Sequence, residues 1–132
     1  MWLVKTEPTA YSYAELAKAK RAVWDGVKNT MALRNLRAMK LGERVFVYHT
    51  GDEKAVVGVA EVAREAYMDP KGSFPSQVVV DLLAVGPLKR PVTLAEIKAR
   101  AEFKESPLVR QGRLSVVPLT PVQAKLIETL GK

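Results

Sequence analysis

Residues 44–55, Arg44-Val45-Phe46-Val47-Tyr48-His49-Thr50-Gly51-Asp52-Glu53-Lys54-Ala55, contain a β-strand and the turn that follows it. Residues 44–50 are predicted to form a strand whose side chains alternate between its two faces, and Gly51 to Lys54 turn the chain into a second strand over 55–67. Gly58 in that strand predicts a bulge or a close approach by another part of the backbone. The two strands therefore form a β-hairpin.

Further strands are predicted on both sides of this hairpin. After a loop over 70–76, the run 77–85 is β-branched and nearly all apolar, which is typical of a central strand. Shorter extended segments are expected at 2–5, 21–24 and 113–118. Because strands outnumber helices and the long ones are joined by hairpins, we predict an α+β fold, in which a curved, mainly antiparallel sheet closes toward a small β-barrel with flanking helices.

The predicted helices are marked by capping residues. Ser12 with Glu15, and Thr93 with Glu96, have the spacing of a capping box and predict helices over 13–20 and from 93 to about 100. Asn29 caps a helix over 30–39 that Gly42 closes, and Thr120-Pro121 opens a final helix that ends at Gly131.

The length and composition point to one soluble domain, residues 1–132. The chain has 132 residues and 48% hydrophobic content, and it contains no cysteine. Its apolar runs are far shorter than the roughly 20 residues of a membrane helix. Its first residues lack the pattern of a signal peptide. We therefore expect a cytoplasmic protein that does not insert into a membrane.

The positive charge is concentrated at one end of the chain. The formal net charge is +7, and residues 1–50 hold nine Lys and Arg against four acids, whereas residues 51–100 hold seven of each. A basic surface attracts phosphates and releases their counterions, so the balance favours a nucleic-acid partner. A basic protein without that role remains the alternative at this point.

Several kinds of chemistry have no support in the sequence. His49 is the single histidine, so no transition-metal site is expected, and neither a phosphate-binding loop nor a nucleophile elbow occurs, so no cofactor is expected. The best acid–base candidates are Lys5 and Glu7, which lie on the same face of a strand. A structural salt bridge between them is the favoured interpretation, and no catalytic residue is assigned.

Seven segments taken together resemble the EVE domain family over residues 2 to about 127. They are 2–8 with Tyr11-Ser12, 24–29, 36–40 with Gly42, 48–50, 58–62, 66–70 and 108–116. The resemblance implies a PUA-like fold, a small β-barrel with flanking helices that is related to the YTH readers of methylated adenine. It also implies a binding module for DNA or RNA that holds a single, modified base in an aromatic-lined pocket.

The residue types suit such a pocket. Trp24 or Tyr48 can stack on a base, and Asn29 offers an amide donor and acceptor. Backbone groups around Tyr48-His49-Thr50 and Leu114-Ser115 can supply further hydrogen bonds. The residues expected to hold phosphates are Lys28, Arg34, Arg37 and Arg113.

Each of these assignments has a structural alternative. A tryptophan such as Trp24 is more often a core residue than part of a ligand cage, Asn29 is also explained as a helix cap, and Arg113 can equally pair with a carboxylate. Tyr48 and His49 alternate on a strand, so only one of them needs to face a pocket.

The sequence departs from the family pattern after the Trp24-Asp25-Gly26 turn. Where the family often has Asn-Tyr-x-Ala-Arg-Asn, residues 29–34 are Asn-Thr-Met-Ala-Leu-Arg. An aromatic and an arginine beside the expected pocket are thereby absent. The final helix has Gln123-Ala124 where a tryptophan is usual.

Two other functions remain open from the sequence. Related PUA-like domains of the ASCH type include hydrolases and nucleases, and Lys5, Glu7 and Tyr48 could serve acid–base chemistry on nucleic acid or modified nucleosides. A protein-interaction adaptor is the other alternative. The sequence does not indicate the oligomeric state.

Overall fold

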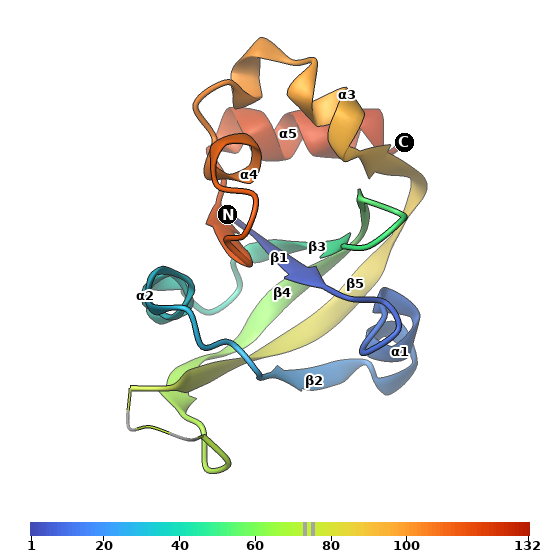
Figure 1. The fold of residues 1–132 in the computed structure, drawn as a ribbon. Helices are drawn as coiled ribbons and strands as arrows, with labels where there is room; N and C mark the ends of the chain where they lie inside the picture. The colour runs from blue at the N-terminus through green and yellow to red at the C-terminus, as the bar shows by residue number, and fades with distance from the viewer. Residues whose placement is uncertain (73, 75) are drawn as a thin grey trace.

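A mixed α+β architecture is seen in the computed structural model, which describes residues 1–72, 74 and 76–132 (Figure 1). The strands are β1 (Trp2–Thr6), β2 (Arg21–Trp24), β3 (Arg44–His49), β4 (Ala55–Met68), β5 (Val78–Thr93) and β6 (Val116–Pro118). The helices are α1 (Tyr13–Ala19), α2 (Thr30–Ala38), α3 (Leu94–Lys98), α4 (Pro107–Arg110) and α5 (Pro121–Leu130), with a short 3₁₀ turn at Ala101–Phe103. Residues 73 and 75 of the predicted loop 70–76 lie outside the described residues.

The strands form one sheet in the order β2-β5-β4-β3-β1-β6. β1 pairs with β3 in parallel, and the remaining pairings are antiparallel, as predicted. The predicted closure into a β-barrel is wrong, because the end strands β2 and β6 are not paired with each other and the sheet stays open. Closure requires the first and last strands to exchange backbone hydrogen bonds, and this long-range pairing leaves no local signal in the sequence.

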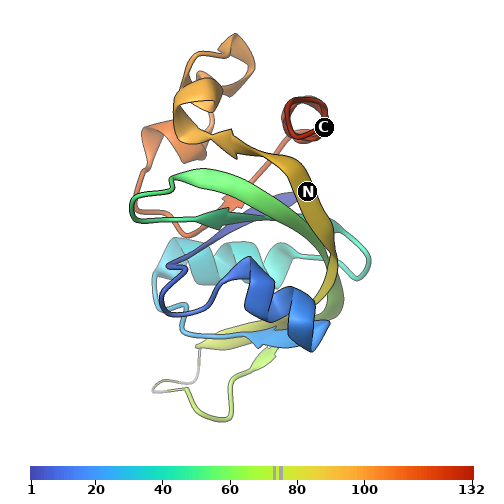
Figure 2. The same cartoon turned by 90° about the vertical axis from the view of Figure 1, so that its right-hand side faces the viewer.

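Curvature comes from the two long strands. β4 and β5 bend together across the molecule (Figures 1 and 2), and their register shifts at several points between Val56 and Tyr67. Each shift leaves one or more extra residues on one strand, which bends the sheet and increases its twist. One shift falls beside Gly58, so the bulge predicted there is confirmed.

The alternative prediction at Gly58, a close approach by another part of the backbone, is wrong, because the group that approaches is a side chain. A Cβ atom on Gly58 would lie 2.5 Å from Cε1 and Cζ of the Tyr13 ring. The Tyr13 hydroxyl donates to the Val59 carbonyl at 2.7 Å, which holds the ring against the strand. The start of α1 is therefore fixed on the middle of β4.

The capping residues begin the helices as the sequence predicted. Ser12, Thr93 and Thr120 each form a complete capping box, and the Asn29 side chain accepts from the Ala32 backbone N–H at 3.0 Å. α2 buries Ala32, Leu33 and Leu36 and turns Arg34 and Arg37 outward.

Two segments differ from the sequence prediction. The last strand begins at Val116 and not at Arg113, because the Leu114 N–H closes a turn onto the Gln111 carbonyl. β5 continues beyond Val85 to Thr93 despite Pro87 and Pro91. β2 pairs with β5 only from Val80 to Leu83. Beyond Leu83 this edge of β5 has no neighbouring strand, so a proline, which lacks an N–H, removes no hydrogen bond of the sheet there.

Among the helices of the described part of the chain, none is both long enough and apolar enough to span a membrane.

Candidate nucleic-acid interface

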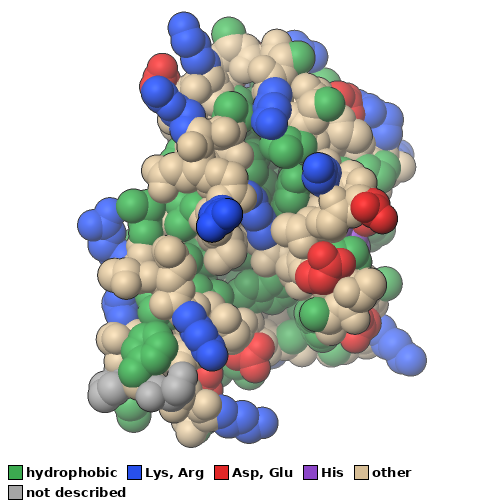
Figure 3. Space-filling model, viewed as in Figure 1, with side chains coloured by type: hydrophobic (Ala, Val, Ile, Leu, Met, Phe, Trp, Pro, Cys, Tyr) green, Lys and Arg blue, Asp and Glu red, His purple; other side chains and the backbone are tan. Residues whose placement is uncertain are grey.

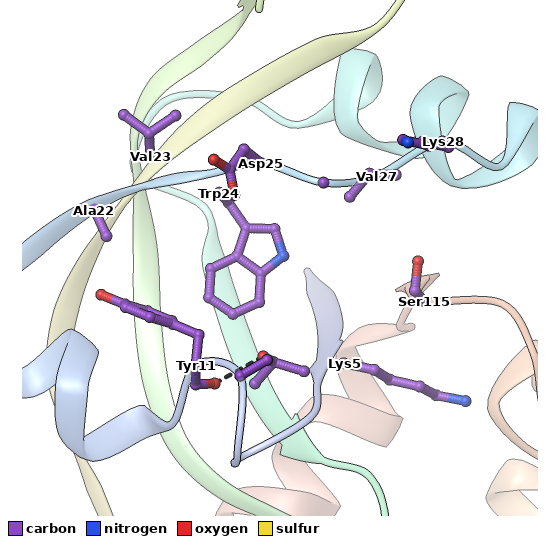
Figure 4. Close-up of a pocket in the computed structure, with 12 residues that line it drawn as sticks. Lys5, Tyr11, Ala22, Val23, Trp24, Asp25, Val27, Lys28 and Ser115 are labelled. Carbon is purple, nitrogen blue, oxygen red and sulfur yellow. Dashed lines mark hydrogen bonds between the residues drawn. The ribbon is translucent and has the colours of Figure 1, made fainter. Parts of the chain in front are cut away.

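A cavity of about 550 Å³ opens beside the end of β2, and we call it the Trp24 cavity. Its walls come from the end of β1, the following loop, β2, the linker to α2 and the residue before β6. The lining residues are Lys5, Thr6, Ala10, Tyr11, Ala22, Val23, Trp24, Asp25, Gly26, Val27, Lys28 and Ser115. Segments far apart in the sequence therefore meet at one hollow (Figure 4).

Two aromatic rings define one wall of the Trp24 cavity. The Tyr11 and Trp24 rings meet edge to face, with centroids 6.2 Å apart and planes at 78°. This contact holds the indole in one orientation and leaves no room for a third ring between the two. Figure 4 shows the indole projecting from the end of β2, with Tyr11 on one side and Ser115 on the other. Tyr11 lies beside the six-membered ring of the indole, and the edge that bears the N–H is on the side of Ser115 (Figure 4).

The Trp24 indole N–H has a free hydrogen-bonding position. Trp24 is only 7% exposed, and its Nε1–H has no acceptor among residues 1–72, 74 and 76–132. The atom is open to solvent, because no fully buried polar side-chain atom of these residues lacks a partner. The other tryptophan differs, since the Trp2 Nε1–H donates to Glu43 Oε1 at 3.0 Å. A buried indole usually finds a partner for this donor, so the free N–H of Trp24 is available to a ligand.

Lys5 fixes the wall opposite Tyr11. Its backbone N–H donates to the Ser115 carbonyl at 2.9 Å, and its Nζ donates to the Gly112 carbonyl at 2.9 Å. Nζ also lies 5.5 Å from the centre of the Tyr48 ring, within the range of a cation–π contact. Burial lowers the pKa of Lys5. These bonds hold Ser115 at the cavity, where its side chain points inward (Figure 4).

The rim of the Trp24 cavity carries charges of both signs. Lys5 and Lys28 contribute ammonium groups and Asp25 contributes a carboxylate. The space-filling view shows a hollow near the middle of the face with basic side chains close to it (Figure 3). The lining therefore combines two ammonium groups with one carboxylate that can accept a hydrogen bond.

A smaller hollow of about 330 Å³ is lined by residues next in sequence to those of the cavity, and we call it the Met31 hollow. Its lining residues are Asn29, Met31, Gln111, Gly112, Arg113 and Leu114. Lys28 of the cavity precedes Asn29 of the hollow, and Leu114 of the hollow precedes Ser115 of the cavity. Two segments of the chain therefore contribute consecutive residues to both spaces.

The residues predicted to hold a ligand are divided between these spaces. Trp24, Lys28 and Ser115 line the Trp24 cavity, while Asn29, Arg113 and Leu114 line the Met31 hollow. The side-chain oxygen of Asn29 caps α2, so the structural alternative given for this residue, a helix cap, is confirmed. Arg34 and Arg37 are exposed on α2, and Arg37 donates to the Ser76 carbonyl.

The other predicted pocket residues, Tyr48, His49 and Thr50, lie outside the lining of either space. Tyr48 is buried beneath Lys5. The His49 ring accepts the Tyr13 N–H at Nε2 and lies 2.7 Å from Glu53 at Nδ1. Alternation along β3 separates Tyr48 from His49, but it does not reveal that α1 and Lys5 cover these side chains.

The salt bridge predicted between Lys5 and Glu7 is replaced by other bonds. Lys5 donates to a backbone carbonyl, and the Glu7 carboxylate accepts from Thr9 Oγ1 at 3.3 Å and from Thr50 Oγ1 at 3.2 Å. Of the three acid–base candidates, Lys5 lines the cavity, whereas Glu7 and Tyr48 do not. The three groups do not converge on one reacting position.

Tyr11 and Asp25 line the cavity, but neither was singled out in the sequence. Tyr11 precedes the capping box of α1, and the Thr6 hydroxyl donates to its carbonyl at 2.7 Å. This hydrogen bond holds the loop between β1 and α1 against the end of β1, and the Tyr11 ring then contacts Trp24. Asp25 was interpreted only as part of a turn. Within the described ranges, no group of three or more His, Asp or Glu side chains is placed to hold a metal ion.

The open α+β sheet with this aromatic-walled cavity is of the EVE and PUA-like class of folds. A model of the EVE domain matches residues 1–130. The chain belongs to the EVE domain family, which confirms the resemblance seen in the sequence.

Curated and structurally solved relatives agree with this assignment. Human thymocyte nuclear protein 1 is 32% identical over 163 residues, an alignment that covers 98% of this chain and 72% of the relative. The NMR structure of Rpa0253 from Rhodopseudomonas palustris is 43% identical, with a TM-score of 0.90, over 98% of this chain and 91% of the other. The human THYN1 protein, solved in complex with 5-methylcytosine-containing DNA, is 31% identical, with a TM-score of 0.90, over 99% and 96% of the two chains. An ASCH protein from Zymomonas mobilis, at 16% identity and a TM-score of 0.57 over 98% and 94% of the two chains, shares the fold alone.

Proposed function

We propose that this protein binds DNA and holds a single modified cytosine base in the Trp24 cavity without altering it. The single observation that carries the proposal is the indole of Trp24, which presents one face and an unpartnered N–H to a cavity with two lysines at its walls. The THYN1 relative in complex with 5-methylcytosine-containing DNA supports this choice of ligand.

Stacking on the indole supplies binding energy. A base that leaves its helical stack costs a few kcal/mol, and stacking on an aromatic side chain returns about 1–3 kcal/mol. Because Tyr11 contacts the edge of the six-membered ring, a base stacked on the indole face has its polar edge toward the N–H, on the side of Ser115 and Lys28. The edge contact from Tyr11 keeps the indole in place when the cavity is empty.

The polar groups of the cavity match the edge of cytosine. Cytosine carries an amino group that donates a hydrogen bond, and an aspartate is a suitable acceptor for it. Asp25 provides that acceptor, and the Trp24 N–H and the Ser115 hydroxyl provide donors for the remaining acceptors of the base. Thymine has a carbonyl in place of the amino group and is disfavoured beside Asp25.

A methyl group on the base gains apolar contact. Ala22, Val23 and Val27 contribute apolar surface to the cavity wall. Burial of one methyl group contributes about 0.8 kcal/mol, which corresponds to a roughly fourfold preference for 5-methylcytosine over cytosine. Lys28, Arg34, Arg37 and Arg113 hold the phosphates and do not distinguish bases.

Fluorescence anisotropy with short single-stranded oligonucleotides tests the proposal. The wild-type protein is expected to bind an oligonucleotide with one 5-methylcytosine about fourfold more tightly than its unmethylated counterpart. Trp24→Ala should remove that preference and weaken binding by about 5- to 150-fold, the equivalent of the stacking energy, while Trp24→Phe retains part of both. Val85→Ala, at an exposed position of β5, is the control.

Circular dichroism shows whether each variant is folded. Equal affinity of the wild-type protein for the methylated and unmethylated oligonucleotides contradicts the proposal, and so does an unchanged preference in a folded Trp24→Ala variant.

A further inference from the structure

We infer that the Met31 hollow binds the nucleotide next to the base held in the Trp24 cavity, so that the protein recognises a single-stranded or locally unpaired dinucleotide. This inference rests on the proposed function, since it requires a nucleotide in the cavity. It assigns a second binding site and a class of ligand, a strand in which two successive bases are unstacked.

The first argument is the continuity of the two spaces. One wall passes from Lys28 in the cavity to Asn29 in the hollow, and the other passes from Ser115 to Leu114. Neighbouring nucleotides of one strand are joined by a single phosphodiester, so they occupy sites that are close together. A strand with one base in the cavity therefore enters or leaves through the hollow.

Both walls are fixed in position. The Asn29 side chain is bonded to the first turn of α2, and the Asn35 amide donates to the Val116 carbonyl at 2.7 Å. On the opposite wall, the Leu114 N–H is bonded to the Gln111 carbonyl, and the Gly112 carbonyl accepts from Lys5 Nζ. The hollow is therefore present before a ligand arrives.

The surface of the hollow suits a base of any sequence. Met31 is 40% exposed at the start of α2, and Leu114 adds apolar surface beside it. A methionine side chain is flexible and polarisable and makes favourable contacts with aromatic rings. Gln111 offers an amide donor and acceptor at the same place. These groups contact a base without selecting one.

The charges at the junction suit the linking phosphate. Lys28 and Arg113 lie on opposite walls and are exposed, and neither forms an ion pair within residues 1–72, 74 and 76–132. Among the described residues, Arg21, Arg44, Arg90 and Arg110 each pair with a carboxylate, whereas Arg34, Arg37, Arg64 and Arg100 form no ion pair, like Arg113. Lys28 and Arg113 are therefore distinguished by their place on the linings of the two spaces. Two unpaired cations at the border of two base-sized spaces favour a phosphodiester between them.

Abasic substitution of the strand tests the inference. The probes are fluorescent single-stranded DNA hexamers with one central 5-methylcytosine and either a thymidine or an abasic tetrahydrofuran residue on its 5′ or 3′ side. The expected result for the wild-type protein is a loss of about fivefold or more in affinity when one particular side is abasic, and little change for the other side.

The variant Met31→Ala should remove this dependence on the flanking base and keep the preference for 5-methylcytosine. Met68→Ala is the matched control, because Met68 is also an exposed methionine and lies outside both linings. Alanine is favourable in a helix, so Met31→Ala keeps α2 intact.

The outcomes separate this inference from the proposed function. Equal binding of all flanking combinations, or the same abasic penalty in Met31→Ala as in the wild-type protein, overturns the inference even when the 5-methylcytosine preference persists. A wild-type protein that shows the Met31-dependent penalty but no methyl preference contradicts only the proposed choice of base.

Discussion

The substitution Gly58→Ala should destabilise the fold and the Trp24 cavity together. An added Cβ would lie 2.5 Å from two atoms of the Tyr13 ring and 2.6 Å from a third. Real Cβ atoms do not approach so closely, so the ring or the strand must move. Tyr13 is 5% exposed, its hydroxyl is bonded to Val59, and its N–H is bonded to His49. The ring therefore cannot move away from the added Cβ without losing contacts.

The magnitude follows from these contacts. Forced overpacking of a core costs about 1–3 kcal/mol. Loss of the Tyr13 hydroxyl bond to Val59 adds about 0.5–1.5 kcal/mol. We therefore expect the free energy of unfolding to fall by roughly 2–4 kcal/mol. Tyr13 lies two residues beyond Tyr11, which contacts Trp24, so affinity for DNA should fall as well.

Urea unfolding followed by circular dichroism measures the change. The matched control is Gly86→Ala, because Gly86 pairs with Val59 on the adjacent strand and a Cβ there meets open space. The control should change stability by less than about 0.5 kcal/mol. If Gly58→Ala unfolds at the same urea concentration as Gly86→Ala, the argument from the Tyr13 contact is refuted.

Three further substitutions test single groups. Asp25→Asn should shift the base preference from cytosine toward thymine, since an amide can donate to the thymine carbonyl. Anisotropy with two oligonucleotides that differ only in this base measures the preference, and an unchanged preference counts against Asp25 as the acceptor. Lys28→Gln should reduce the slope of log affinity against log salt by about 1, whereas no change would place Lys28 away from the phosphates. Arg90 lowers the pKa of Glu96 to about 2, below its ordinary value, so the ion pair stabilises the fold fully above about pH 4.5 and is lost as the pH falls toward 2. Urea unfolding of Glu96→Gln from pH 6 to 2 should lack this part of the acid-induced loss; an identical pH profile would contradict it.

Local signals predicted much of the fold. The capping boxes at Ser12, Thr93 and Thr120 and the cap at Asn29 all begin helices, because each depends on a few adjacent residues. The hairpin of β3 and β4 was predicted for the same reason. The open edge between β2 and β6 was not, because the choice between an open and a closed sheet depends on strands at opposite ends of the chain.

The candidate site was predicted only in part for a related reason. Trp24, Lys28 and Ser115 were placed at a ligand site through the family resemblance, and they line the cavity. Tyr48 was expected beside them as an aromatic side chain able to stack on a base, but neither its residue type nor its alternation with His49 shows that Lys5 covers it. Tyr11 was missed because only the loop between β1 and α1 brings its ring to Trp24.

The indole N–H resonances of the two tryptophans test the central claim most directly. The Trp2 N–H is bonded to Glu43, away from the cavity, whereas the Trp24 N–H faces the space in which the base is proposed to lie. In ¹H–¹⁵N spectra, a single-stranded DNA hexamer with one 5-methylcytosine should shift the Trp24 resonance and leave the Trp2 resonance in place. Binding that leaves the Trp24 resonance unmoved, or that moves both resonances alike, would contradict a base stacked on Trp24.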